Sequence, residues 1–153
     1  MKTLSVGDRA PHFALPAHTG ATVRLGDFAG KKSIVLYFYP KDHTPGCTTE
    51  AKAFRDRYGT FVEAGAEVIG VSSDSIKSHL RFADTLRLPF VLASDEDDAV
   101  RERYGVGKAL GLIPGRVTYV IDRDGIVRHV FSSQLDPARH VDEALHALKA
   151  LAE

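Results

Sequence analysis

The fold of this chain is decided by residues 33–50, which read SIVLYFYPKDHTPGCTTE. Residues 33–39 form a continuous apolar run rich in β-branched and aromatic side chains, which is typical of a strand buried on both faces. Thr44 is placed to cap a helix, and Pro45 suits the first helical position, where a missing N–H costs nothing. The stretch therefore predicts a central strand that leads into a helix, with Cys47 in the first helical turn.

The rest of the chain continues the alternation of strands and helices. A helix from Cys47 to Gly65 is expected because apolar residues recur at helical spacing. A strand is expected at 66–72, followed by a helix that Ser73 and Asp74 cap and that has Ile76, Leu80, Ala83 and Leu86 on its apolar face. A strand at 90–93 and a helix from a near capping box at Ser94 and Asp97 to Gly105 come next. The chain is expected to end with a hairpin of 116–121 and 125–131 and a last helix marked by Val141, Leu145, Leu148 and Leu151. This order predicts an α/β fold with a mixed sheet flanked by helices, and the first thirty residues are expected to add a small hairpin.

Length and charge narrow the classes of function. A chain of 153 residues is expected to form one domain over residues 1–153. Twenty Lys and Arg residues balance twenty Asp and Glu residues, so the charge favours neither a nucleic acid nor an anionic membrane as partner. The first residues contain no apolar stretch of the kind that a signal peptide requires, and the expected location is the cytoplasm.

The sequence also gives no ground for a metal or a cofactor. Its seven histidines include no pair at i, i+4 spacing, and one cysteine cannot complete a zinc pattern. Neither a GxGxxG nor a GxxxxGK[ST] loop is present, so no nucleotide cofactor is expected.

Cys47 is the only cysteine, so any chemistry that it performs uses a single thiol. Free cysteines are often buried and inert, but residues 44–50 contain no leucine, isoleucine, valine or phenylalanine. The position at a helix start instead favours a thiolate, because the helix dipole and the free N–H groups stabilise negative charge.

The helix start alone is too weak to activate a thiol. Lowering a cysteine pKa from about 8.5 to about 6 requires about 3.4 kcal/mol, whereas a helix terminus typically supplies about 0.3 to 1 kcal/mol. A nearby guanidinium would supply the rest, because arginine stays charged at any working pH. Local sequence alone does not locate this arginine.

The motif Pro40-Lys41-Asp42-His43-Thr44-Pro45-Gly46-Cys47 resembles the Pro-x-x-x-Thr-x-x-Cys signature of peroxiredoxins, and Thr44-Pro45-Gly46-Cys47-Thr48 most resembles the bacterioferritin-comigratory or PrxQ branch. The resemblance extends over nearly the whole chain and includes residues 7–13, 92–95 and 116–122. It implies a thioredoxin-like fold and a peroxidase that reduces hydrogen peroxide or organic hydroperoxides. Cys47 would be the peroxidatic cysteine, which becomes a sulfenic acid.

The same resemblance implies roles for residues around Cys47. Thr44 would present its hydroxyl to thiolate and peroxide, Pro40 would shield the pocket from water, and the backbone at Gly46 would line the pocket. Plainer interpretations remain open, since Thr44 is also a helix cap and Pro40 also a strand terminator.

Two charged residues complete the site that the resemblance implies. Arg116 matches the distant active-site arginine of the family, although strand-start arginines are usually solvated. Glu50, one turn after Cys47, could orient Arg116, or it could simply be a first-turn glutamate favoured by the helix dipole.

Many members of this branch carry a resolving cysteine five residues after the peroxidatic one, where this chain has Lys52. The sulfenic acid would then need an external thiol, such as thioredoxin, glutaredoxin or a low-molecular-weight thiol, with an intermolecular disulfide as a minor route.

The chain is expected to be a monomer or a weak homodimer. Two other functions stay open: a peroxide sensor that signals through oxidised Cys47, and a scaffold with an inert cysteine.

Overall fold

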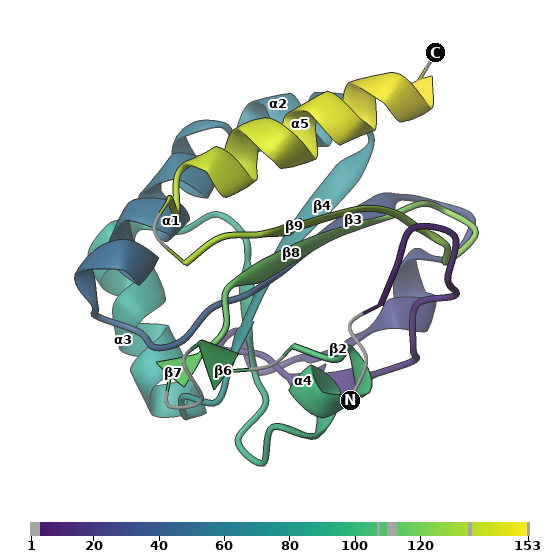
Figure 1. Cartoon of the computed structure of the whole chain (residues 1–153). Coiled ribbons are helices and arrows are strands. Elements are labelled where there is room, and N and C mark those ends of the chain that lie inside the picture. The colour runs from purple at the N-terminus through teal and green to yellow at the C-terminus, as the bar shows by residue number, and fades with distance from the viewer. Residues whose placement is uncertain (1–3, 107, 110–112, 135, 153) are drawn as a thin grey trace.

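A five-stranded mixed sheet forms the centre of the molecule, with strand order β5-β4-β3-β8-β9 (Figure 1). The computed structural model describes residues 4–106, 108–109, 113–134 and 136–152. The strands are β3 (Ser33–Phe38), β4 (Ala66–Ser72), β5 (Val91–Ser94), β8 (Val117–Ile121) and β9 (Val127–Ser132). Because β3 pairs in parallel with β4 and antiparallel with β8, the predicted central strand and mixed sheet are confirmed.

The two faces of β3 pack into two different cores. Val35 and Tyr37 belong to one core, and Leu36 and Phe38 belong to the other, as expected when successive strand residues point to opposite faces. The first core is covered by α1 (Pro45–Asp56), α2 (Tyr58–Glu63), α3 (Ile76–Leu86) and α5 (Arg139–Ala152), and the second by the N-terminal segment and α4 (Ala99–Arg103) (Figure 1). Among the described residues, no helix is both long enough and apolar enough to cross a membrane.

The predicted N-terminal hairpin is present. It consists of β1 (Ala14–Pro16) and β2 (Thr22–Arg24), which pair antiparallel and lead into the 3₁₀ turn η1 (Leu25–Phe28). A second small pair, β6 (Lys108–Ala109) with β7 (Ile113–Pro114), was not predicted, because strands of two residues carry no periodicity that a sequence can reveal.

The helix expected between Cys47 and Gly65 is divided in two at Arg57. There the backbone N–H donates to the carbonyls of Phe54 and Arg55, and α2 begins at the next residue. At the start of α2, the Tyr58 hydroxyl donates to Glu67 on β4 at 2.8 Å. The next residue, Gly59, has a low helix propensity.

The predicted cap and apolar face of α3 were partly wrong. Ser75, rather than Ser73 or Asp74, caps the helix by accepting from the Ser78 N–H at 3.1 Å. Leu80 is exposed, and His79 is buried in its place. Leu151, expected on the apolar face of α5, is also exposed.

The capping box predicted at Ser94 and Asp97 does not form. Ser94 ends β5, and its hydroxyl donates to the Asp74 carbonyl. The carboxylate of Asp95 accepts from the N–H groups of Val100 and Arg101, and Asp97 accepts from the Ala99 N–H, so two acidic side chains lie at the start of α4.

Close packing around Gly70 on β4 yields a stability prediction. A Cβ at this position would lie 2.8 Å from ring atoms of Tyr37 and 2.9 Å from Leu92. The Tyr37 ring is stacked on Phe54 at 4.5 Å and cannot withdraw freely. Gly70→Ala should therefore lower the free energy of unfolding by about 1 to 3 kcal/mol, measured by urea denaturation.

Gly59→Ala is the matched control, because no atom lies within 4 Å of a Cβ added there and the residue is helical. It should raise the free energy of unfolding by about 0.5 to 1 kcal/mol. Equal effects of the two substitutions would contradict the described packing of Gly70.

Candidate active site

Cys47 lies in the first turn of α1, directly beyond the loop that connects β3 to this helix. Thr44 adopts the extended backbone of an N-cap, and Pro45 takes the first helical position, as predicted. Within the described part of the chain, however, the Thr44 hydroxyl does not cap the helix, and donates instead to the Lys41 carbonyl at 2.7 Å. Cys47 is only 1% exposed, so it lies in the core at the N-terminal end of α1.

Arg116 provides the guanidinium that activation of Cys47 requires in addition to the helix start. It immediately precedes β8, which pairs with β3, and its Nη2 donates to the Cys47 Sγ at 3.4 Å. Arg116 is 5% exposed, so it is a buried cation rather than a solvated one. A cation in direct contact with sulfur stabilises the thiolate.

Gly46 allows this close approach. A Cβ at residue 46 would lie 3.0 Å from the Nη2 of Arg116, which is closer than almost all real contacts of this kind. The glycine predicted to line the pocket thus borders the guanidinium. Pro40 is half-buried in the loop between β3 and α1, together with Thr44.

Glu50 lies one turn after Cys47, as predicted, and its side chain is fully buried. One carboxyl oxygen, Oε1, accepts from the Nη1 of Arg116, so the arginine bridges Glu50 and Cys47. Burial raises the pKa of Glu50 from 4.5 to about 8, although the Arg116 charge acts in the opposite direction. The buried carboxyl therefore keeps its proton to a higher pH than an exposed glutamate does.

His140 on α5 is a part of the site that the sequence did not reveal. Its Nδ1 lies 3.6 Å from Glu50 Oε2, an oxygen with no hydrogen-bond partner among the described residues. Burial lowers the pKa of His140 to about 4, so the ring is neutral. Its Nε2 donates to the Ser133 carbonyl at 2.9 Å and its Nδ1 accepts from the Thr118 hydroxyl at 2.7 Å. The only sequence signal was its place on the apolar stripe of the last helix.

Arg101 on α4 is a second buried arginine that sequence reasoning missed. It donates to the carbonyl of Tyr39, at the end of the central strand, and to the carbonyl of Gly115, each at 2.9 Å. These bonds join the start of the active-site loop, residues 40–44 between β3 and α1, to the residue before Arg116. Burial lowers the pKa of Arg101, and the nearby Cys47 and two carboxylates oppose that shift.

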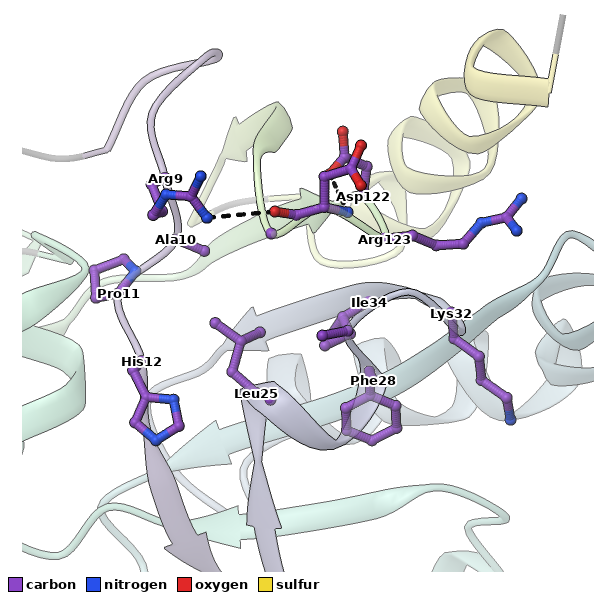
Figure 2. Close-up of a pocket in the computed structure, with 14 residues that line it drawn as sticks. Arg9, Ala10, Pro11, His12, Leu25, Phe28, Lys32, Ile34, Asp122 and Arg123 are labelled. Carbon is purple, nitrogen blue, oxygen red and sulfur yellow. Dashed lines mark hydrogen bonds between the residues drawn. The ribbon is translucent and has the colours of Figure 1, made fainter.

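The best-formed pocket of the described residues lies elsewhere. It has a volume of about 470 Å³ and is bounded by the N-terminal segment, η1 and the turn between β8 and β9. Figure 2 shows Arg9 and Asp122 across this pocket from Leu25 and Phe28. Ile34, at the far end of β3 from the active-site loop, also lines it, and Cys47 does not. The chemistry of the thiol is therefore not located in this pocket.

One group of side chains in the described ranges could offer ligands to a metal ion: Asp42, Asp74 and His79, whose ligand atoms lie within 4.8 Å of one another. These atoms already hydrogen-bond to other groups. Asp42 and His79 bind each other at 2.6 Å, and Asp74 accepts from the Ser72 hydroxyl at 2.6 Å. The cluster is better described as a buried polar network.

Comparison with known proteins relates this site to a family. Residues 6–130 match the AhpC/TSA family. The chain is 49% identical over 146 residues to chloroplastic peroxiredoxin Q of Sedum lineare, an alignment that covers 95% of this chain and 78% of that protein.

Solved structures agree with that relationship. The crystal structure of a cysteine mutant of PrxQ from Xylella fastidiosa matches with a TM-score of 0.91 and 32% identity over 100% of both chains. Bacterioferritin comigratory protein of Xanthomonas campestris, studied for alkyl peroxide reduction, matches with a TM-score of 0.85 and 36% identity over 92% of both chains. The likeness confirms the predicted thioredoxin-like fold.

The raised pKa of Glu50 predicts a pH dependence of stability. Folding favours the protonated carboxyl, so the contribution of Glu50 is complete below about pH 4.5 and is lost as the pH rises through about 8. The free energy of unfolding of Glu50→Gln, measured in urea, should therefore rise relative to that of the wild type between these two pH values.

Glu63→Gln is the control, because it removes an exposed carboxylate from α2 with no buried partner to lose. Its difference from the wild type should stay nearly constant over the same pH range. A constant difference for Glu50→Gln as well would show that the buried carboxyl is not held protonated.

Proposed function

The chain belongs to the AhpC/TSA family, and on that basis we propose that Cys47 reduces hydrogen peroxide and organic hydroperoxides and is recycled by an external thiol. The enzyme class is that of a thiol-dependent peroxidase of the peroxiredoxin Q type. The proposal concerns which peroxides are reduced, which thiol is the reductant and what each residue of the site does.

The observation that carries the proposal is the contact of 3.4 Å between the Arg116 guanidinium and the Cys47 sulfur. Both groups are buried, and the electrostatic interaction between them is stronger than it would be in water. A thiol at a helix start and beside a fixed positive charge is arranged for nucleophilic attack.

The proposed reaction begins when the Cys47 thiolate attacks one peroxide oxygen. A sulfur–oxygen bond forms and the O–O bond breaks, which oxidises the sulfur to a sulfenic acid and releases hydroxide or an alkoxide. The leaving oxygen takes up a proton and departs as water or an alcohol. Arg116 stabilises the negative charge on that oxygen, because its guanidinium is already in place before the reaction.

The remaining site residues would shape the peroxide pocket. The Thr44 hydroxyl, which now donates to Lys41, keeps its lone pairs free to accept a hydrogen bond from the peroxide. Pro40 would keep water from the sulfur, and Gly46 would keep space open beside the guanidinium.

Recycling by an outside thiol is expected because the sequence contains no second cysteine. A thiol would condense with the sulfenic acid to give a mixed disulfide and water, and a second thiol would then release Cys47. Burial of Cys47 disfavours a disulfide between two chains as the main route. A reducing compartment such as the cytoplasm would supply the thiols.

The burial of Cys47 also favours one alternative, a peroxide sensor. A sulfur that is 1% exposed is difficult for a protein reductant to reach, and slow recycling would let the oxidised form persist. The alternative predicts oxidation without sustained turnover.

Arg116→Met should slow the reaction of the protein with hydrogen peroxide by about 100-fold or more, since removal of one group that stabilises a developing oxyanion commonly costs that much. The rate of the first oxidation, followed by stopped-flow fluorescence or competition, measures this effect. Arg123→Met is the control, because Arg123 is exposed in the β8–β9 turn. Oxidation of Arg116→Met at the wild-type rate would exclude the proposed role of the arginine.

Peroxide consumption with thioredoxin, glutaredoxin plus a small thiol, or the small thiol alone should identify the reductant. At least one of these should sustain many turnovers, and Cys47→Ser should sustain none with any of them. Turnover by Cys47→Ser equal to that of the wild type would refute the peroxidase mechanism. A single oxidation without turnover in all three assays would favour the sensor.

A further inference from the structure

A fully buried pair, Asp42 and His79, joins the active-site loop, residues 40–44, to α3 and has no assigned role in the reaction. His79 on α3 places its Nδ1 2.6 Å from an oxygen of Asp42 in this loop, and neither side chain is exposed. The hydroxyls of Tyr39 and Ser78 donate to the same carboxylate at 2.6 and 2.9 Å. The second ring nitrogen of His79 lies 3.0 Å from the Ala93 carbonyl.

The hydrogen-bond partners define the charge of the pair. The two ring nitrogens of His79 face a carboxylate and a backbone carbonyl, and both of these are acceptors. Both nitrogens therefore have an acceptor to which they can donate, and when both carry protons His79 is an imidazolium paired with the Asp42 carboxylate. A buried pair of this kind is stable only while both partners remain together.

The ion pair fastens the active-site loop to α3. The Asp42 N–H donates to the Asp74 carboxylate at 2.8 Å, just before that helix. The next residue, His43, has a left-handed backbone (φ 64°), and its ring packs on Phe82 at 5.1 Å. Such a backbone is uncommon for residues other than glycine, although histidine adopts it more readily than most, and it persists where its surroundings hold it.

Movement of this loop would expose the sulfur. Only Pro45 and Gly46 separate Thr44 from Cys47, so an outward shift of the loop must carry the first turn of α1 with it. The closed arrangement keeps Cys47 beside Arg116 for peroxide attack. The same arrangement prevents access by a bulky thiol, on which recycling depends in a chain without a second cysteine.

We propose that the Asp42–His79 ion pair is a latch that holds the active-site loop closed over Cys47 and limits access to the sulfur by molecular size. Asp42 and His79 are positioning residues that act through the loop and do not touch the peroxide. The consequence for reductant choice rests on the proposed peroxidase function, whereas the latch itself does not. Opening of the latch would be a gating step of the kind that loops perform in many enzymes.

Asp42→Asn is the first test, because it removes the negative charge and nearly preserves the shape of the side chain. Reduced protein would be alkylated with iodoacetamide as the small probe and with a maleimide joined to polyethylene glycol as the bulky probe. The ratio of the bulky to the small rate should rise about tenfold, which corresponds to about 1.4 kcal/mol in favour of opening. Hydrogen exchange of residues 40–47 should rise with it, and the reaction with peroxide should slow.

Leu148→Ala is the matched control, because it weakens the core at a residue of α5, outside the loop and outside α3. It should leave the ratio of alkylation rates unchanged. If Asp42→Asn does not fold, Ser78→Ala removes a single hydrogen bond to Asp42 and should shift the ratio in the same direction by a smaller factor.

An unchanged ratio in the folded variants, or an equal rise in Leu148→Ala, would overturn the latch. Alkylation and hydrogen exchange need no peroxide, so these outcomes are distinct from a failure of the peroxidase function. Peroxide turnover by the wild type together with an unchanged ratio would refute the latch alone.

Discussion

The buried guanidinium of Arg116 is the constraint on which the site depends. A cation removed from water is costly unless anionic or hydrogen-bonding partners surround it, and here those partners are the Cys47 sulfur and Glu50. The sulfur is in direct contact with the guanidinium, whereas burial opposes the ionisation of Glu50 by raising its pKa. Pairing of β8 with β3 brings Arg116 and Cys47 together across 69 positions of sequence, and Gly46 leaves room for their contact. The proposed reactivity of the thiol thus depends on the buried charge of Arg116 beside it.

The closed arrangement that holds Cys47 against Arg116 also keeps the sulfur away from a large reductant. A peroxide is small, whereas a protein thiol is large, and the chain has no cysteine of its own to resolve the sulfenic acid. In the proposed cycle, the closed loop would serve oxidation by the peroxide, and an open loop would serve regeneration by a thiol. The Asp42–His79 pair connects α3 to the loop that precedes the first turn of α1. In the proposal, this contact sets the equilibrium between the closed and the open loop. In this account the pair contributes to the reaction through the population of the closed state rather than through contact with substrate.

Apolar periodicity and turn chemistry were enough to predict the main elements from the sequence. The strand at 33–39, the start of α1 and the mixed order of strands were predictable, because each depends on a local pattern. The need for a guanidinium was evident from magnitudes, but only the resemblance located it at Arg116. His79, His140 and Arg101 were missed because a buried polar residue cannot be distinguished in sequence from an exposed one until its partners are known. Leu80 misled the prediction for α3 for the same reason, since the loop binds the neighbouring histidine and turns that leucine to solvent.

The central claim is that Cys47 alone, activated by Arg116, carries the oxidising equivalent of the peroxide. The most direct measurement treats fully reduced protein with less than one equivalent of hydrogen peroxide, traps the product with a dimedone probe and locates the adduct by mass spectrometry. The account predicts a sulfenic acid on Cys47 in proportion to the peroxide consumed, with no disulfide-linked dimer as the main product. Consumption of peroxide that leaves Cys47 unmodified, or that converts it chiefly to a disulfide between two chains, would contradict the account.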